Sequence, residues 1–142
     1  MKIEYLDNKI IIYTTDKNID SLEEYCNNII DELKNMYNIN LKGFYHVNAF
    51  IDKEYGIVLE LNLEDRDLYI DLSKIDLHII KYDINFLFEI DDIFDIDVNN
   101  FILYNNKYYI DVNNISNDNI EFVKLIYKNT DTIRKKGVLL CK

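Results

Sequence analysis

One segment, residues 20–37, carries apolar side chains at helical spacing, and it constrains the fold more than any other feature of the chain. Its apolar positions are Leu22, Cys26, Ile29, Ile30, Leu33 and Met36. Side chains three or four residues apart share one face of a helix, so this pattern predicts a half-buried amphipathic helix. Asp20 or Ser21 can cap it, because each has a glutamate three residues further on. The rest of the chain must supply the surface that covers the apolar face.

Hairpins on both sides of this segment supply that surface. Residues 1–15 predict two strands joined at Asp7-Asn8, and residues 44–63 predict two strands joined through a turn that ends at Gly56. The second of these strands alternates cleanly, with Ile57, Leu59, Leu61 and Leu63 on one face. We therefore expect the helix to pack its apolar side chains against Ile57, Leu59 and Leu61.

The second half of the chain continues the strand pattern. The expected elements up to residue 94 are strand-like stretches at 68–72 and 77–79 (or a short helix beginning at Ser73), a strand at 84–90, and one helical turn with Ile93 and Phe94. They are followed by a hairpin at 101–112 that turns at Asn105-Asn106, a second helix at 116–128, and a strand at 138–141 after Gly137. The fold class is therefore α+β, with antiparallel sheets of hairpins packed against two amphipathic helices. No proline and no serine-rich linker interrupts the chain, so we expect one compact domain over 1–142, with possible halves 1–66 and 67–142.

Composition narrows the class of protein. Hydrophobic residues make up 49% of the 142 positions, which is enough apolar surface for a domain that folds without disulfides or a structural metal. Only two cysteines occur, and Cys26 lies on the apolar face of the expected helix, which indicates a buried thiol. No segment has the length and hydrophobicity of a signal peptide core or a membrane span. We expect a cytoplasmic protein.

The charge is negative and unevenly distributed. The net charge is −10, although residues 121–142 carry six basic and two acidic side chains. Residues 1–120 therefore carry −14, which repels nucleic-acid phosphates and favours a basic partner. The same charge is also what solubility alone requires.

The densest acidic cluster does not fit a calcium loop. It consists of Glu89, Asp91, Asp92, Asp95 and Asp97. Counting from Asp91, an EF-hand needs glycine at the sixth position and glutamate at the twelfth, where this chain has Ile96 and Ile102. These carboxylates are more typical of a helix cap and a solvated surface.

No other pattern indicates catalysis. His46 and His78 lack ligands at metal-binding spacing, and the three glycines form no phosphate-binding loop. The sequence alone does not exclude Cys26 and His46 as a nucleophilic pair, although Cys26 should be buried. We predict no enzyme, no cofactor and no metal.

The order of these elements resembles the MecA family of adaptor proteins, which deliver substrates to a Clp-type unfoldase. Residues 1–13 are similar to the opening strands of that family, and 43–63 to its next hairpin. Residues 88–93 and the Leu-Tyr and Tyr-Tyr pairs of 103–110 resemble its C-terminal domain, where Lys135-Lys136-Gly137 occupies the place of a Glu-Tyr-Gly. The resemblance implies an adaptor that acts through protein contacts.

Two functions remain after these exclusions. The first is a non-catalytic regulatory or adaptor protein, and the alternative is a small acidic inhibitor that mimics nucleic acid, as a phage-encoded protein does. Both need a protein partner and neither binds nucleic acid or membrane directly. The candidate protein-binding residues are the acidic run Asp91, Asp92, Asp95 and Asp97 and the hairpin tyrosines Tyr104, Tyr108 and Tyr109.

Overall fold

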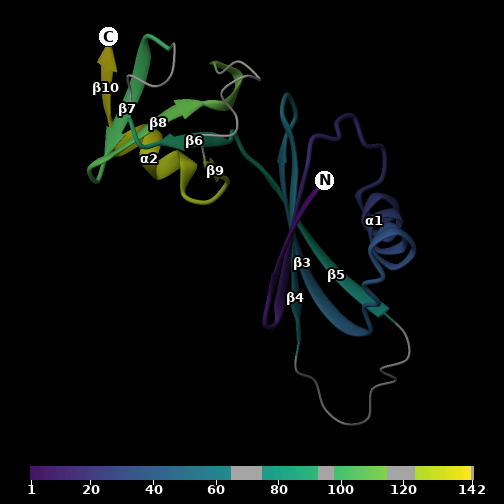
Figure 1. The fold of residues 1–142 in the computed structure, drawn as a ribbon. Coiled ribbons are helices and arrows are strands. Elements are labelled where there is room, and N and C mark those ends of the chain that lie inside the picture. Colours follow the sequence, from purple (N-terminus) through teal and green to yellow (C-terminus); the bar gives the residue numbers. More distant parts are fainter. Residues whose placement is uncertain (65–74, 93–97, 115–123, 142) are drawn as a thin grey trace. The chain divides into compact units, whose positions relative to one another are not determined.

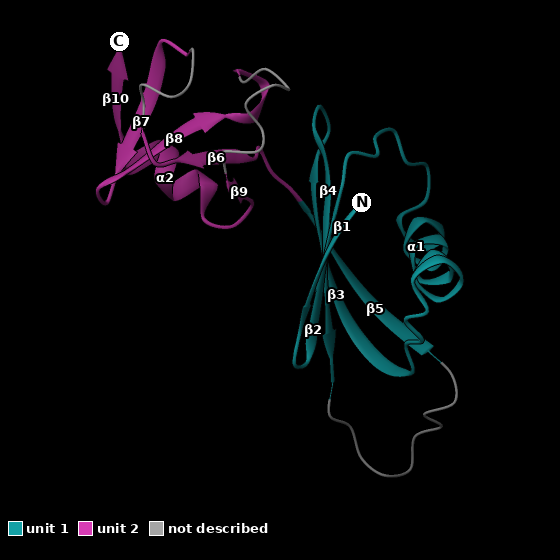
Figure 2. Ribbon diagram, in the orientation of Figure 1, with its two compact units in different colours: residues 1–82 teal, residues 83–142 magenta. Residues whose placement is uncertain are grey.

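The computed structural model describes residues 1–64, 75–92, 98–114 and 124–141. The chain divides into two compact units, unit 1 (residues 1–82) and unit 2 (residues 83–142), shown in Figure 2. The described residues of each unit form one five-stranded sheet and one α-helix, which confirms the expected α+β class. The expected single domain stays a prediction, and its suggested division at residue 66 lies outside the described residues.

Unit 1 is a sheet with one long helix on one face. Its elements are β1 (Lys2–Leu6), β2 (Lys9–Thr14), α1 (Leu22–Tyr37), β3 (Gly43–Asp52), β4 (Gly56–Leu63) and β5 (Ile75–Asp83). The strand order is β1-β2-β4-β3-β5, and β1/β2, β2/β4 and β3/β4 pair antiparallel. Both hairpins expected in this half are confirmed, and the strand pattern at 77–79 becomes part of β5.

Helix α1 confirms the first sequence prediction. Ser21 is its N-cap, and the Ser21 hydroxyl accepts a hydrogen bond of 3.3 Å from the amide of Glu24. Asn38 ends the helix in the left-handed conformation. The buried face of the helix and the inner face of the sheet form one hydrophobic cluster, which includes Cys26, Ile29, Leu33, Ile57, Leu59 and Leu61. The expected packing is therefore confirmed.

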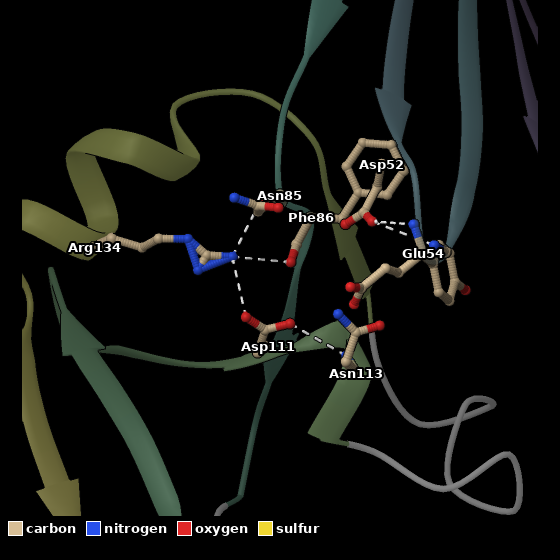
Figure 3. Close-up of polar contacts among 8 residues, drawn as sticks. Asp52, Glu54, Asn85, Phe86, Asp111, Asn113 and Arg134 are labelled. Atoms are coloured by element: carbon tan, nitrogen blue, oxygen red, sulfur yellow. Dashed lines mark hydrogen bonds and ion pairs between the residues drawn. The ribbon is translucent and has the colours of Figure 1, made fainter.

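The β3–β4 turn is organised by one carboxylate. Asp52 accepts hydrogen bonds from the backbone amides of Glu54 (3.0 Å) and Tyr55 (3.2 Å), as Figure 3 shows for the labelled pair. This is the usual way in which aspartate stabilises a tight turn. Gly56 follows because a β-carbon there would collide with the backbone carbonyl of Thr14.

Unit 2 is a second sheet of short strands. Its elements are β6 (Leu87–Ile90), β7 (Asn100–Tyr104), β8 (Lys107–Asp111), the 3₁₀ turn η1 (Val112–Asn114), β9 (Lys124–Ile126), α2 (Thr130–Lys136) and β10 (Val138–Cys141). The strand order is β10-β7-β8-β6-β9. Asn105 and Asn106 both have positive φ (49° and 63°), as a tight hairpin turn requires, so the expected Asn-Asn turn and the final strand are confirmed.

The C-terminal part of the second expected helix is a strand. Residues 124–126 of the expected helix 116–128 form strand β9, in which Leu125 lies opposite Phe88 and Ile126 opposite Leu87. Pairing with a buried strand overrides the helical spacing of so short a segment. A helix that the sequence did not predict, α2, is the one α-helix among the described residues of this unit. Residues 116–123, the expected strand 68–72, the alternative helix at Ser73 and the expected turn at Ile93 and Phe94 lie outside the described residues.

Helix α2 is fixed to its sheet by one arginine. Arg134 donates hydrogen bonds of 3.1 Å to the backbone carbonyls of Asn85 and Phe86 and forms an ion pair of 3.6 Å with Asp111 (Figure 3). Ile133, the residue before Arg134 in α2, packs in a hydrophobic cluster with Leu87 and Tyr109. These contacts set the position from which the chain enters β10.

Candidate functional site

A groove lies between helix α1 and strand β5 in unit 1. Its volume is about 530 Å³, and it is lined by Leu22, Glu23 and Asn27 of α1 and by Ile75, Asp76, Leu77 and Ile79 of β5. We call it the acidic groove, because the charged residues in its described lining, Glu23 and Asp76, are both carboxylates. Among the strands that the structure describes, β5 ends the sheet on one side and has β3 as its neighbour on the other (Figure 1).

The strand side of the groove has an apolar row and a backbone edge. Ile75, Leu77 and Ile79 are half-buried and contact the hydrophobic cluster beneath α1. Their two-residue spacing places all three on the helix side of the sheet, and Asp76 on the other side. An edge strand also presents amide and carbonyl groups that a further strand can pair with. The groove therefore combines an apolar floor with a template for strand addition.

A hydrogen-bond network holds the start of α1 against the sheet. The Tyr25 hydroxyl donates to the Asp16 carboxylate at 2.7 Å and lies 2.9 Å from the Thr14 hydroxyl. Burial raises the pKa of Tyr25 well above its ordinary value, and the hydrogen bond to Asp16 acts in the same direction. Thr14 also donates to the carbonyl of Ile57 in β4. This network positions Leu22 and Glu23 at the helix end of the groove.

The opposite face of the unit 1 sheet carries polar side chains. His46 and His78 have ring centroids 5.4 Å apart, and His46 lies 3.8 Å from the Glu64 carboxylate. Glu60 is only 2% exposed and lies 3.9 Å from the ammonium of Lys9. Among the described residues, no three His, Cys, Asp or Glu side chains form a group that could hold a metal ion.

Cys26 and His46 do not form a nucleophilic pair. Cys26 belongs to the cluster under α1, whereas His46 alternates with Tyr45 and Val47 of that cluster and so lies on the opposite face of β3. Burial also raises the pKa of the Cys26 thiol to about 11, which keeps it protonated near neutral pH. The alternative that the sequence left open is wrong.

The acidic run lies only partly in the described structure. Asp91 and Asp92 directly follow β6 and are exposed. Asp95 and Asp97 lie outside the described residues. The geometry of the run as a binding surface therefore stays a prediction.

The three hairpin tyrosines differ in their surroundings. Tyr109 is 6% exposed and belongs to the core cluster under α2, and half-buried Tyr104 packs against the same cluster. The Tyr109 hydroxyl donates to Glu89 at 3.5 Å, and burial raises its pKa. Tyr108 is half-buried and, by strand alternation, lies on the other face of the sheet. Tyr104 and Tyr109 are thus brought together in the core, apart from Tyr108.

The groove was not predicted from the sequence. Two residues of its apolar row, Leu77 and Ile79, belong to a predicted strand pattern, and Glu23 belongs to one of the two possible capping boxes. Nothing local in the sequence shows that β5 ends the sheet beside α1, because that depends on the strand order.

The comparisons with known proteins give no relative. Neither described helix has the length and hydrophobicity needed to cross a lipid bilayer. No protein family, curated protein or solved structure matches the chain.

Proposed function

We propose that the protein is a non-catalytic adaptor that binds an extended, basic segment of a partner protein in the acidic groove. The observation that carries this proposal is the meeting of an edge strand and an apolar row in one groove of about 530 Å³, with Glu23 on the helix beside it and Asp76 on the other face of the strand. Extended peptides commonly bind by adding a strand to such an edge, with alternate side chains entering adjacent pockets.

The groove defines the pattern of the bound segment. In an added strand, residues on the helix side lie beside Ile75, Leu77 and Ile79, so they should be apolar. The intervening residues lie on the side of Asp76, and the strand passes Glu23 at the start of α1, so lysine or arginine is favoured near both carboxylates. The partner segment should alternate apolar and basic residues.

The resemblance to MecA-type adaptors supports the same class of function. That resemblance rests on the order of elements and on short motifs, and it implies protein contacts rather than chemistry. The adaptor proposal for this chain stands on the groove and does not depend on the identity of an unfoldase partner.

The experiment uses the full chain and a synthetic peptide, Lys-Val-Lys-Ile-Lys-Val-Lys. Its control has glutamate at every lysine position, and a second control has proline at the central isoleucine. Titration should shift the amide resonances of α1 and β5 with the lysine peptide only. Proline should remove binding because it cannot donate to a strand ladder.

A matched pair of variants tests the charge. Glu23→Lys should weaken binding by about two- to fivefold, the usual range for an exposed ion pair, with a further loss from repulsion. Glu24→Lys changes the same charge one residue away, outside the groove lining, and should change the affinity less. Equal effects of the two changes, or equal binding of both peptides, would contradict the proposal.

The inhibitor alternative has its own observation. Residues 1–82 carry 16 acidic and 9 basic side chains, and Glu23, Glu24 and Asp31 are exposed on α1. A nucleic-acid mimic would displace DNA from a basic DNA-binding protein in proportion to the total charge of this surface. In that case Glu23→Lys and Glu24→Lys should weaken displacement equally, and the proline peptide should bind as well as its parent.

A further inference from the structure

The final strand of unit 2 leaves apolar side chains uncovered at a sheet edge. Val138 is 58% and Leu139 68% exposed, and Cys141 is exposed as well. Strand β10 pairs with β7 on one side and, among the described strands of unit 2, ends the sheet on the other. Proteins normally protect such an edge with charges, proline or a covering segment, since it otherwise recruits another strand. In β10 none of the four residues is charged or proline.

The charges beside this edge are basic. Lys135 and Lys136 are exposed in the last turn of α2, and Gly137 leads directly from them into β10. Arg134 of the same turn is bound to Asn85, Phe86 and Asp111, so its position is fixed within unit 2. The lysine pair therefore lies next to the beginning of β10, at Val138.

We propose that the β10 edge is a second protein-binding site, which takes an extended apolar segment with acidic residues at one end. Val138 and Leu139 lie on opposite faces of the strand, so the apolar residues of that segment cover Leu139 on one face, and its carboxylates lie beside Lys135 and Lys136. Charge complementarity selects this occupant over a basic segment. The site is independent of the acidic groove, which selects the opposite charge.

The test uses the full chain and two synthetic peptides, Val-Thr-Val-Thr-Val-Asp-Asp and its reverse-charged form that ends in Lys-Lys. We expect the acidic peptide to shift the amide resonances of residues 138–141 and to slow hydrogen exchange along β10. The basic form should leave β10 unchanged. Shifts that lie only outside β10, or equal effects of both peptides, would overturn the proposal.

Three variants separate the contributions. Lys136→Glu should weaken binding of the acidic peptide by about two- to fivefold. Lys124→Glu makes the same change of charge on β9, at the other edge of the sheet, and should weaken binding less. Leu139→Ala should also weaken binding, and because this side chain is mostly exposed the fold should be retained. Retention is checked by the unchanged amide spectrum of β6 and β8.

The oligomeric state distinguishes a second copy from the proposed partner. Sedimentation of the free chain should show no self-association that depends on Leu139. A dimer that protects β10 from exchange without peptide, and that Leu139→Ala dissociates, would overturn the proposal in favour of pairing between two copies of the edge. Failure here leaves the acidic groove untouched, because its peptide has the opposite charge.

Discussion

The two units end in sheet edges with opposite character. In unit 1 the edge strand β5 has its apolar residues half-buried beside α1, in a groove whose charged lining is acidic. In unit 2 the edge strand β10 has Val138 and Leu139 largely exposed, next to a pair of lysines. Each unit thus has an edge strand. The edge strand β5 lies beside a helix and carboxylates, whereas the edge strand β10 is exposed and lies beside lysines.

This contrast teaches that backbone geometry and specificity have different sources. Either edge can pair with any extended chain, because its amide and carbonyl groups carry no sequence information. The side chains around each edge decide which chain is preferred. The two proposed sites therefore select segments of opposite charge.

The largest expected difference between the units concerns their cysteines. Cys26 is buried and its pKa is raised to about 11, so on the order of a thousandth of it is thiolate at about pH 8. Iodoacetamide should therefore modify exposed Cys141 on the order of a hundredfold faster or more, as mass spectrometry of the two peptides can show. Comparable alkylation rates in the folded chain would mean that the hydrophobic cluster beneath α1 often opens and exposes Cys26 to solvent.

The pH dependence of Cys26 has a defined sign. Below pH 11 its thiolate fraction rises with pH, so its alkylation should accelerate as pH increases. Because burial raises the folded-state pKa, the unfolded chain releases this proton first. The contribution of the buried thiol to stability is present below about pH 9 and is lost as pH rises toward 11. Cys26→Ala should remove this component from the pH dependence of unfolding.

The core of unit 1 provides the next largest effect. Leu59 lies in the central strand β4 and is 1% exposed, so Leu59→Ala should lower the free energy of unfolding by about 2–5 kcal/mol. Leu63→Ala removes the same atoms from the 39% exposed end of the same strand and is the control. Denaturant unfolding measures both changes. An unmoved midpoint for Leu59→Ala would contradict the packing of α1 on this sheet.

Arg134 provides the corresponding change in unit 2. Arg134→Met removes hydrogen bonds to the carbonyls of Asn85 and Phe86 and the ion pair with Asp111, and it should cost about 1–3 kcal/mol. Lys135→Met in the next position is exposed and should cost less. Hydrogen exchange of β6 and β8 measures the effect locally. If both substitutions behave alike, Arg134 does not fix α2.

Local patterns predicted much of this fold from the sequence. Helix α1, the hairpins of unit 1 and the Asn105-Asn106 turn follow from contacts between residues close in the chain, whereas the choice of Ser21 over Asp20 as the helix cap did not. The class of fold follows from the same patterns. These elements could be predicted because spacing and turn chemistry determine them directly.

The features that were missed depend on contacts between distant segments. Strand β9 forms because Leu125 and Ile126 pair with β6, some 37 to 39 residues away in the chain. The burial of Tyr109, a candidate binding residue, depends in the same way on Leu87 and Ile133, which come from β6 and α2. Both candidate edges depend on the strand order of a sheet, which no local pattern reveals.

A smaller effect is expected in the network that positions the acidic groove. Tyr25→Phe removes the hydrogen bond to Asp16 and the contact with Thr14, and it should cost about 0.5–1.5 kcal/mol. The exposed Tyr37 at the other end of α1 provides the control, Tyr37→Phe. Binding of the lysine peptide should weaken with the first change only. Loss of stability without weaker binding would show that the network supports the fold but not the groove.

The smallest expected effect is that of salt concentration on peptide binding. It separates the backbone hydrogen bonds, which both edges would form with a peptide, from the contribution of the charged side chains. Raising the ionic strength from about 0.1 M to about 1 M shortens the screening length from about 10 Å to about 3 Å. The preference of the acidic groove for the lysine peptide and that of the β10 edge for the acidic peptide should both shrink, while the apolar contribution of Leu139 persists. Titrations at the two salt concentrations measure this. If the charge preferences survive high salt, the contacts are buried ion pairs rather than exposed ones, and the two edges differ in shape as well as in charge.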